Sequence, residues 1–182
     1  MKARLHRCCS GVVNVLPMYR YLVSDISSPR SSRFLIARSI IVCDPRIVRP
    51  SLADLLRPSM QTLKHIVLNI CVDDARGDPL CGIPSELEDM RTKNIIESIT
   101  ILIKVRQADT SCSRGEAWAS LDEVLTTPEW FALKRVSLDI EIASYDIGDE
   151  LEVALLQLPG TQFPRLSTSN SVSFDFKVDP VW

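Results

Sequence analysis

The stretch Val136-Ser137-Leu138-Asp139-Ile140-Glu141-Ile142 alternates apolar and polar residues without interruption. Side chains of a β-strand point to opposite faces in turn, so this pattern predicts a strand with one buried and one exposed face. Three further stretches share the pattern, at residues 66–72, 99–105 and 172–178. The first residues of the four stretches are 33, 37 and 36 positions apart. This spacing indicates a repeated unit whose neighbours must stack to bury their apolar sides.

A helix signal precedes each of these predicted strands. Ser51 is a suitable N-cap for a helix over residues 52–56, because its hydroxyl can accept a hydrogen bond from a first-turn N–H group. The Ser-x-x-Glu sequences at 85–88 and 120–123 predict capping boxes at the starts of two more helices. Asp149 can cap a fourth helix. Helices and strands that alternate along a chain predict an α/β fold with a parallel sheet.

The polar residues of the four strands predict how the sheet is covered. A parallel sheet with helices on both faces has strands that are apolar throughout, whereas these strands are apolar on one side only. We therefore expect helices on one face of a curved parallel sheet, in a solenoid of about four irregular repeats. The repeats occupy residues 51–182, which we expect to form one domain.

Residues 1–50 differ from the rest of the chain in charge. They carry nine Lys and Arg against two Asp, a net charge of +7, so the remaining residues sum to −9. A basic arm can bind nucleic acid or acidic lipid, but these basic residues are scattered rather than clustered. We therefore expect a basic leader that is poorly ordered or forms a partial opening unit. Its strand candidates are residues 34–36 and 39–43.

The sequence lacks the motifs of metal, nucleotide and membrane sites. Its six cysteines form no Cys-x-x-Cys pair, and its six glycines form no phosphate-binding loop. No apolar stretch reaches the ~18 residues that a membrane span needs, and no signal-peptide cleavage pattern follows the first one. We expect no cofactor, no metal, no nucleic acid and no membrane partner. We also expect an intracellular monomer, cytoplasmic or nuclear.

Catalytic chemistry has few candidates in this chain. Histidine occurs at His6 and His65, and no local pattern places either beside a nucleophile and an orienting acid. We expect His65 to be a surface or packing residue, and we predict no catalytic residue. Trp118 and Trp130 flank the third predicted helix, where they can pack against it or serve as anchors for a partner.

The exposed face of the predicted sheet supplies the candidate binding residues. Like positions of neighbouring strands lie ~4.8 Å apart, so we expect Asp139, Glu141 and Asp175 to form an acidic cluster. Such carboxylates can perform acid–base chemistry, hold a divalent ion, recognise a partner or simply remain solvated. We predict that a protein partner binds six residues of this face: Asn69, Lys104, Asp139, Glu141, Asp175 and Lys177.

The amino-acid sequences of the repeats are similar to those of a known family. The stretches at residues 56–66, 94–101, 121–136 and 163–167 resemble the leucine-rich-repeat-like region that follows the F-box in fungal F-box-type proteins. The resemblance covers residues 50–178 and implies a leucine-rich-repeat-like solenoid that recruits a substrate protein to a ubiquitin ligase. The F-box itself is not evident in the sequence.

These observations lead to one expected function and two alternatives. We expect a non-catalytic protein–protein interaction module, with substrate recognition in a ubiquitin-ligase context implied by the resemblance alone. The first alternative is a truncated repeat protein with a structural role or no retained function. The second is a hydrolase-type enzyme.

Overall fold

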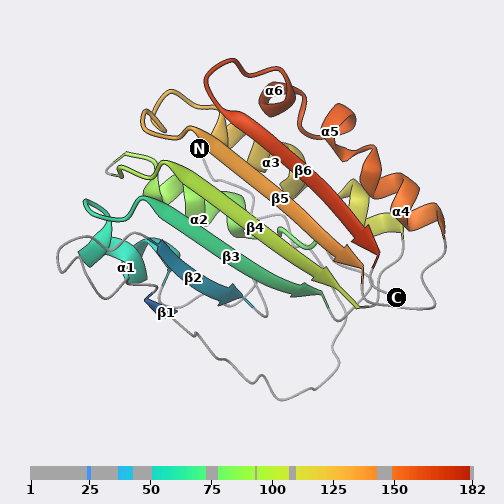
Figure 1. The fold of residues 1–182 in the computed structure, drawn as a ribbon, viewed down its shortest axis with the longest axis horizontal. Coiled ribbons are helices and arrows are strands. Elements are labelled where there is room, and N and C mark those ends of the chain that lie inside the picture. The colour runs from blue at the N-terminus through green and yellow to red at the C-terminus, as the bar shows by residue number, and fades with distance from the viewer. Residues whose placement is uncertain are drawn as a thin grey trace, which may run out of the picture.

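The structure is a computed structural model in which strands line up in the order of the sequence. It describes residues 24–25, 37–42, 51–72, 78–92, 94–106, 110–142 and 149–180. Within these ranges six strands form one sheet in the order β1-β2-β3-β4-β5-β6 (Figure 1). β1 (Ser24–Asp25) pairs antiparallel with β2 (Ala37–Val42). Every later pair is parallel.

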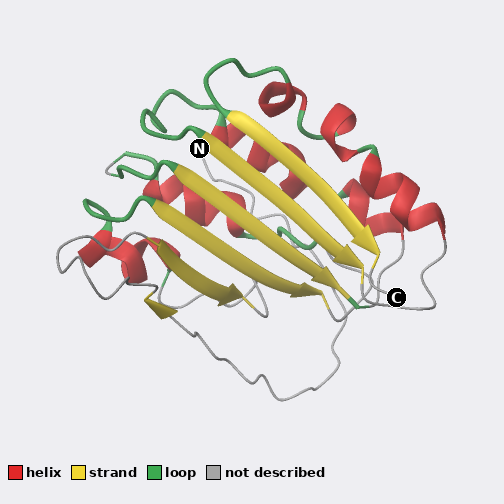
Figure 2. Cartoon of the chain, viewed as in Figure 1, coloured by secondary structure: helices red, strands yellow, loops and turns green. Residues whose placement is uncertain are grey.

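The four long strands have eight residues each, and short helices connect them. The strands are β3 (His65–Val72), β4 (Ser98–Val105), β5 (Arg135–Ile142) and β6 (Ser173–Pro180). The α-helices are α1 (Leu52–Leu56), α2 (Ile83–Met90), α3 (Glu116–Leu125), α4 (Asp149–Leu156), α5 (Leu158–Thr161) and α6 (Pro164–Ser167). Two 3-10 helices span Arg57–Ser59 and Thr110–Arg114. Figure 2 shows α2 and α3 behind the sheet, α1 beside its β2 end, and α4, α5 and α6 along its β6 edge. None of these labelled helices lies in front of the strands, so the sheet has a helix side and an open face.

The alternating sequence of the strands builds the core. In β3, β4 and β5 every second residue is buried, and its neighbour is at least partly exposed. The buried residues, such as Ile66, Ile101 and Leu138, pack in one cluster with helix residues such as Leu87 and Trp118. The parallel pairings of β2 to β6 confirm the predicted α/β fold with a parallel sheet. The period of two along each strand places its apolar side chains under the helices.

The register of the last strand differs from the prediction. Ile66, Ile99 and Val136 lie side by side on β3, β4 and β5 as predicted, but Phe174 rather than Val172 pairs with Val136. Three helices, α4, α5 and α6, separate β5 from β6, and Val172 is buried in the loop that leads into the strand. The shift is two residues, which preserves the predicted face of every β6 side chain.

The helix caps follow the prediction at α1 but not at α2 and α3. Ser51 Oγ accepts a hydrogen bond from Asp54 N (3.0 Å), as predicted. α2 begins after Gly82, whose φ of 85° suits glycine, and the predicted cap Ser85 lies inside the first turn. α3 begins after Gly115, and the predicted cap Ser120 instead donates its hydroxyl to the Glu116 carbonyl. Both predicted capping boxes are therefore wrong.

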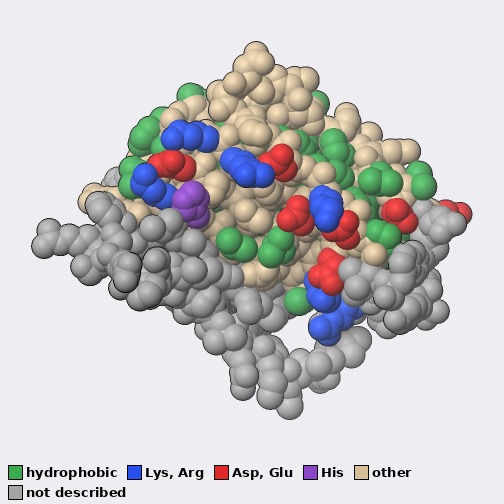
Figure 3. All heavy atoms as spheres, viewed as in Figure 1, with side chains coloured by type: hydrophobic (Ala, Val, Ile, Leu, Met, Phe, Trp, Pro, Cys, Tyr) green, Lys and Arg blue, Asp and Glu red, His purple; other side chains and the backbone are tan. Residues whose placement is uncertain are grey.

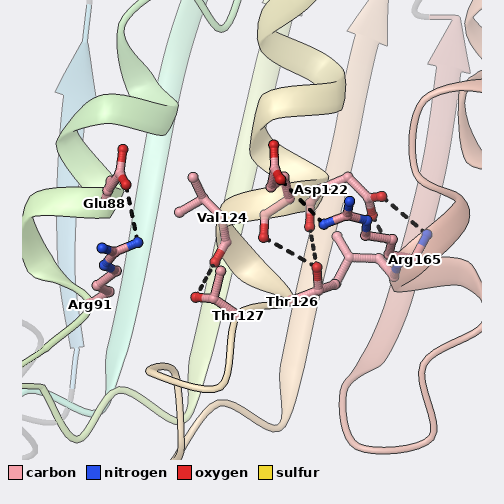
Figure 4. A network of polar contacts seen from close by, with 9 residues as sticks. Glu88, Arg91, Asp122, Val124, Thr126, Thr127 and Arg165 are labelled. Carbon is pink, nitrogen blue, oxygen red and sulfur yellow. Dashed lines mark hydrogen bonds and ion pairs between the residues drawn. The ribbon is translucent and has the colours of Figure 1, made fainter. Parts of the chain in front are cut away.

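Carboxylates from distant parts of the sequence cap α3 and α6. Asp78 accepts hydrogen bonds from Ala117 N at the start of α3 (2.8 Å) and from Leu80 N (3.0 Å). Burial raises the pKa of the Asp78 carboxyl, although both backbone N–H groups favour its ionised form. Asp122 of α3 accepts hydrogen bonds from the backbone N–H groups of Arg165 (3.1 Å) and Leu166 (2.8 Å) in α6 (Figure 4).

At the first helix a carboxylate of the next unit adds to the local cap. Glu86 of α2 accepts a hydrogen bond from Leu52 N (2.6 Å), the first residue of α1, which Ser51 precedes. Asp149 is the first residue of α4, but its side chain lies outside the described part of the structure. The three carboxylates Asp78, Glu86 and Asp122 therefore link neighbouring units of the fold to one another.

Part of the first fifty residues joins the sheet. β2 covers residues 37–42 and pairs in parallel with β3, so it overlaps the strand predicted at residues 39–43. The strand predicted at residues 34–36 lies outside the described residues, as does most of the predicted leader.

Candidate functional site

The open face consists of rows of side chains that cross the four long strands. Because the strands are parallel and in register, one residue of each strand contributes to each row. From the amino to the carboxyl ends of the strands the rows are His65-Ser98-Arg135-Ser173, Val67-Thr100-Ser137-Asp175, Asn69-Leu102-Asp139-Lys177 and Cys71-Lys104-Glu141-Asp179. All six residues predicted to bind a partner lie on this face, in the last three rows.

Acidic and basic side chains alternate on the open face, as Figure 3 shows. Lys104 Nζ lies 2.9 Å from Glu141 Oε1 on the neighbouring strand. Arg135 Nε lies 2.6 Å from Asp175 Oδ2 in the same way. These side chains are 40–64% exposed, so water screens each pair and its contribution to stability is small.

Lys177 is the basic residue of the edge strand β6. Its ammonium lies 2.5 Å from Asp179 Oδ2, two residues further along the strand. The hydrogen bond to Asp179 is the main cause that raises the pKa of Lys177, and the charge of Asp139 on β5 adds to it. Lys177 therefore lies between two carboxylates and remains charged at neutral pH.

The predicted acidic cluster of Asp139, Glu141 and Asp175 is not formed. Asp175 lies opposite Ser137, and Lys177 rather than Asp175 is the neighbour of Asp139. Glu141 and Asp175 are each paired with a basic residue of a neighbouring strand. The two-residue shift of β6 is the physical reason, because it moves an acidic residue one row away and brings a basic one in.

A shallow hollow of about 450 Å³ lies at the carboxyl end of the open face. Leu102 and Cys71 contribute apolar surface to its lining, while Lys104, Asp139 and Asp179 contribute charge. A mixture of apolar contact and charge suits the side chains of a protein partner. Within the described ranges, no three His, Cys, Asp or Glu side chains come together as a metal site.

The structure brings together two residues that sequence reasoning did not connect. His65 Nδ1 lies 2.6 Å from Ser98 Oγ on the next strand. The sequence could have predicted this contact, because His65 and Ser98 are 33 residues apart, which is the spacing between the first two repeats. Each is therefore the first residue of its strand, and the two lie side by side. A catalytic triad contains a hydroxyl beside an imidazole and a carboxylate that orients the imidazole. Among the described residues, no carboxylate takes that third position at His65.

A second unpredicted group lies just before the strands begin. The carboxylate of Glu97 lies 2.6 Å from Lys64 Nζ and 3.1 Å from Lys134 Nζ, and these two lysines belong to the units on either side. Hydrogen bonds from both lysines lower the pKa of the Glu97 carboxyl from 4.5 to about 2. This group links three consecutive units at one edge of the open face.

The two tryptophans belong to the core rather than to a binding surface. Trp118 is fully buried, and its indole N–H donates to the Cys112 carbonyl (2.7 Å). Trp130 is 4% exposed. Trp118 lies within α3 rather than beside it, because the helix begins at Glu116. Of the two interpretations of these residues, packing in the core is confirmed for both.

Comparisons with other proteins add no functional assignment to this geometry. Among the helices of the described residues, none combines the length and the apolar character that crossing a membrane requires. No protein-family model matches the chain, and no curated protein or solved structure is significantly similar to it.

Proposed function

We propose that this chain is a leucine-rich-repeat-like solenoid that binds a protein partner and does not catalyse a reaction. Repetition of the chain path supports the solenoid. Glu97 N and Ser98 N both donate to the Lys64 carbonyl, and one unit later Lys134 N and Arg135 N both donate to the Glu97 carbonyl. Consecutive units thus enter the sheet in the same way, as stacked repeats do.

The open face is the observation that carries the binding proposal. It is built on strands whose other side is buried, so the rows of side chains have a rigid support. None of the described helices covers it, and its charged side chains are about half exposed (Figure 3). Alternating charges on a rigid surface select a partner by electrostatic complementarity. The six residues predicted from the sequence, together with Arg135 and Asp179, form this proposed surface.

The proposed setting rests on the family resemblance. A leucine-rich-repeat-like region of an F-box-type protein would present a substrate protein to a ubiquitin ligase inside the cell. A direct binding assay with a Skp1-type adaptor tests this setting. Absence of adaptor binding would reject the ligase context while leaving partner binding by the open face intact.

A photo-crosslinking amino acid at two matched positions tests the binding proposal. Thr100 lies near the centre of the open face, whereas Ser120 lies exposed on α3, on the opposite side of the molecule. In a cell extract, the variant labelled at position 100 should crosslink one defined protein, and the variant labelled at position 120 should not. Crosslinks from position 120 alone would move the site to the helices. Crosslinks from neither position would favour the alternative of a repeat protein without a retained partner.

The contact between His65 and Ser98 supports the second alternative, a hydrolase. Hydrolysis of p-nitrophenyl acetate that is lost in both Ser98→Ala and His65→Ala variants would favour this alternative. Activity that is absent, or that persists in the two variants, would contradict it.

A further inference from the structure

The outer edge of β6 has backbone groups available for pairing. β6 pairs with β5 alone among the described strands, and it is the outermost strand in Figure 1. Ser173 N donates to the Lys134 carbonyl (2.8 Å), so the N–H group of Ser173 points towards β5. Because N–H groups alternate in direction along a strand, those of Phe174, Phe176 and Val178 point to the outer edge.

The apolar residues of β6 are incompletely buried. On the helix side of β5, Val136, Leu138 and Ile140 are no more than 2% exposed. Their counterparts Phe174, Phe176 and Val178 are only partly buried, although they pack against the same core. The difference arises because, among the described strands, β6 has a neighbour on one side only. One more strand at this edge would cover these side chains and pair their outward backbone groups at the same time.

The open-face residues of β6 define the charges that such a strand must carry. Asp175, Lys177 and Asp179 read acidic, basic and acidic in either chain direction. A strand of complementary charge therefore reads basic, acidic and basic, with apolar residues between. Pro180 occupies the next edge-facing position and has no N–H group, which ends the pairing segment there.

We infer that the edge of β6 between Phe174 and Asp179 binds an extended segment of a partner protein as a seventh strand. The segment has the pattern basic–apolar–acidic–apolar–basic. Backbone hydrogen bonds supply the binding energy, and the cross-strand charges supply the register and selectivity. The charged residues of this edge also belong to the open face, whereas the outward N–H groups of Phe174, Phe176 and Val178 do not. Val178→Pro therefore tests the edge separately from the open face.

A second copy of this chain fits the edge less well. Antiparallel pairing of two β6 strands about Phe176 would place Asp175 opposite Lys177, but Asp179 would then face Ser173 rather than a basic residue. In Figure 1 the helices α4, α5 and α6 extend past β6 at this edge. A second copy would bring the same helices into that space, whereas a single extended segment carries none.

A pair of synthetic peptides tests the inference on the full chain. The first peptide, Thr-Lys-Val-Glu-Val-Lys-Thr, has the complementary pattern, and the second, Thr-Glu-Val-Lys-Val-Glu-Thr, has the reversed charges. Fluorescence anisotropy should show the first binding at least about tenfold more tightly, because three cross-strand pairs change from attractive to repulsive. Equal affinities, or no binding of the first peptide, would overturn the inference.

Two sets of variants locate the binding at β6. Val178→Pro deletes an edge-facing N–H group without removing a bond to β5, whereas Val178→Thr keeps that group and serves as the matched control. The proline variant should bind the first peptide at least about tenfold more weakly than the threonine variant. Equal binding by the two variants would overturn the inference.

Charge exchange on β6 keeps the test decisive if the proline variant does not fold. A triple variant, Asp175→Lys, Lys177→Asp and Asp179→Lys, should prefer the second peptide over the first. Retained preference for the first peptide would contradict binding at this strand. Self-association of the unmodified chain that is kept in Val178→Thr but lost in Val178→Pro would contradict the partner segment and identify a second copy as the occupant.

Discussion

The two sides of the sheet are made by the same strands but are built on different physical terms. On the helix side Leu138 is 1% exposed and belongs to a continuous apolar core. The next residue, Asp139, faces the open side, where it lies between Leu102 and Lys177. Burial of apolar area stabilises the fold, whereas exposed ion pairs contribute little. The open face can therefore vary in charge for a binding role while the helix side keeps the structure.

The largest expected effect is the loss of a core side chain. Leu138→Ala should lower the free energy of unfolding by ~2–5 kcal/mol, because it removes buried methyl groups and leaves a cavity. Ser137→Ala, the neighbouring substitution on the open face, is the control. Urea unfolding of both variants measures the contrast. Similar losses in the two variants would mean that the two sides do not differ as described.

The next effect concerns a polar residue on the helix side. Asp122 is 3% exposed and holds two N–H groups at the start of α6. Asp122→Ala would leave these groups without an acceptor and should lower the free energy of unfolding by ~1–3 kcal/mol. Glu123→Ala removes the exposed neighbouring carboxylate and should have a much smaller effect. Equal losses in urea unfolding would show that the cap is not important.

Gly115 tests how closely two units approach each other on the helix side. A Cβ atom at this position would lie 2.0 Å from Asp78 Oδ2, so Gly115→Ala must displace the carboxylate that caps α3. We expect the free energy of unfolding to fall by ~1–3 kcal/mol. Gly160→Ala is the matched control, because nothing lies within 4 Å of its added Cβ atom. Thermal unfolding in which both variants behave alike would contradict the close approach.

Glu97 links units at the edge of the open face, and its effect depends on pH. Its pKa is about 2 in the folded protein against an ordinary 4.5, so the unfolded chain takes up the proton first on acidification. The stabilisation by Glu97 is therefore complete above pH 4.5 and disappears as the pH falls towards 2. The difference in stability between the unmodified chain and Glu97→Gln should shrink over this range in urea titrations. A stability difference between the unmodified chain and Glu97→Gln that is constant with pH would contradict the lowered pKa. The control is Glu129→Gln, which changes a glutamate at an exposed loop position.

The smallest effect belongs to the open face itself. Asp139→Ala should change the free energy of unfolding by less than ~0.5 kcal/mol, as expected for a partly exposed site outside the core. Urea unfolding beside Leu138→Ala gives the sharpest form of the comparison, since the two residues are adjacent in the sequence. A loss above about 1 kcal/mol, which is twice the expected limit, would show that the open face contributes to stability.

The strands and their faces could be predicted from the sequence because their information is local. Alternation of apolar and polar residues around Leu138 states which side chains turn towards the core, whatever the rest of the chain does. The spacing between repeats likewise aligned Ile66, Ile99 and Val136. For the candidate site, this was sufficient to assign Asn69, Lys104 and Asp139 to the open face.

The neighbours of those residues were decided by the tertiary structure. The register of β6 depends on how α4, α5 and α6 fill the connection from β5, and no pattern within the strand specifies it. The partners of Asp78 and Asp122 lie about forty residues away in the sequence, so their capping roles follow from the packing of units. A sequence period of two determines the direction in which a side chain points, because it is a property of the strand alone. Which charge it meets is determined by three-dimensional packing, because that contact joins two strands whose alignment depends on the connection between them.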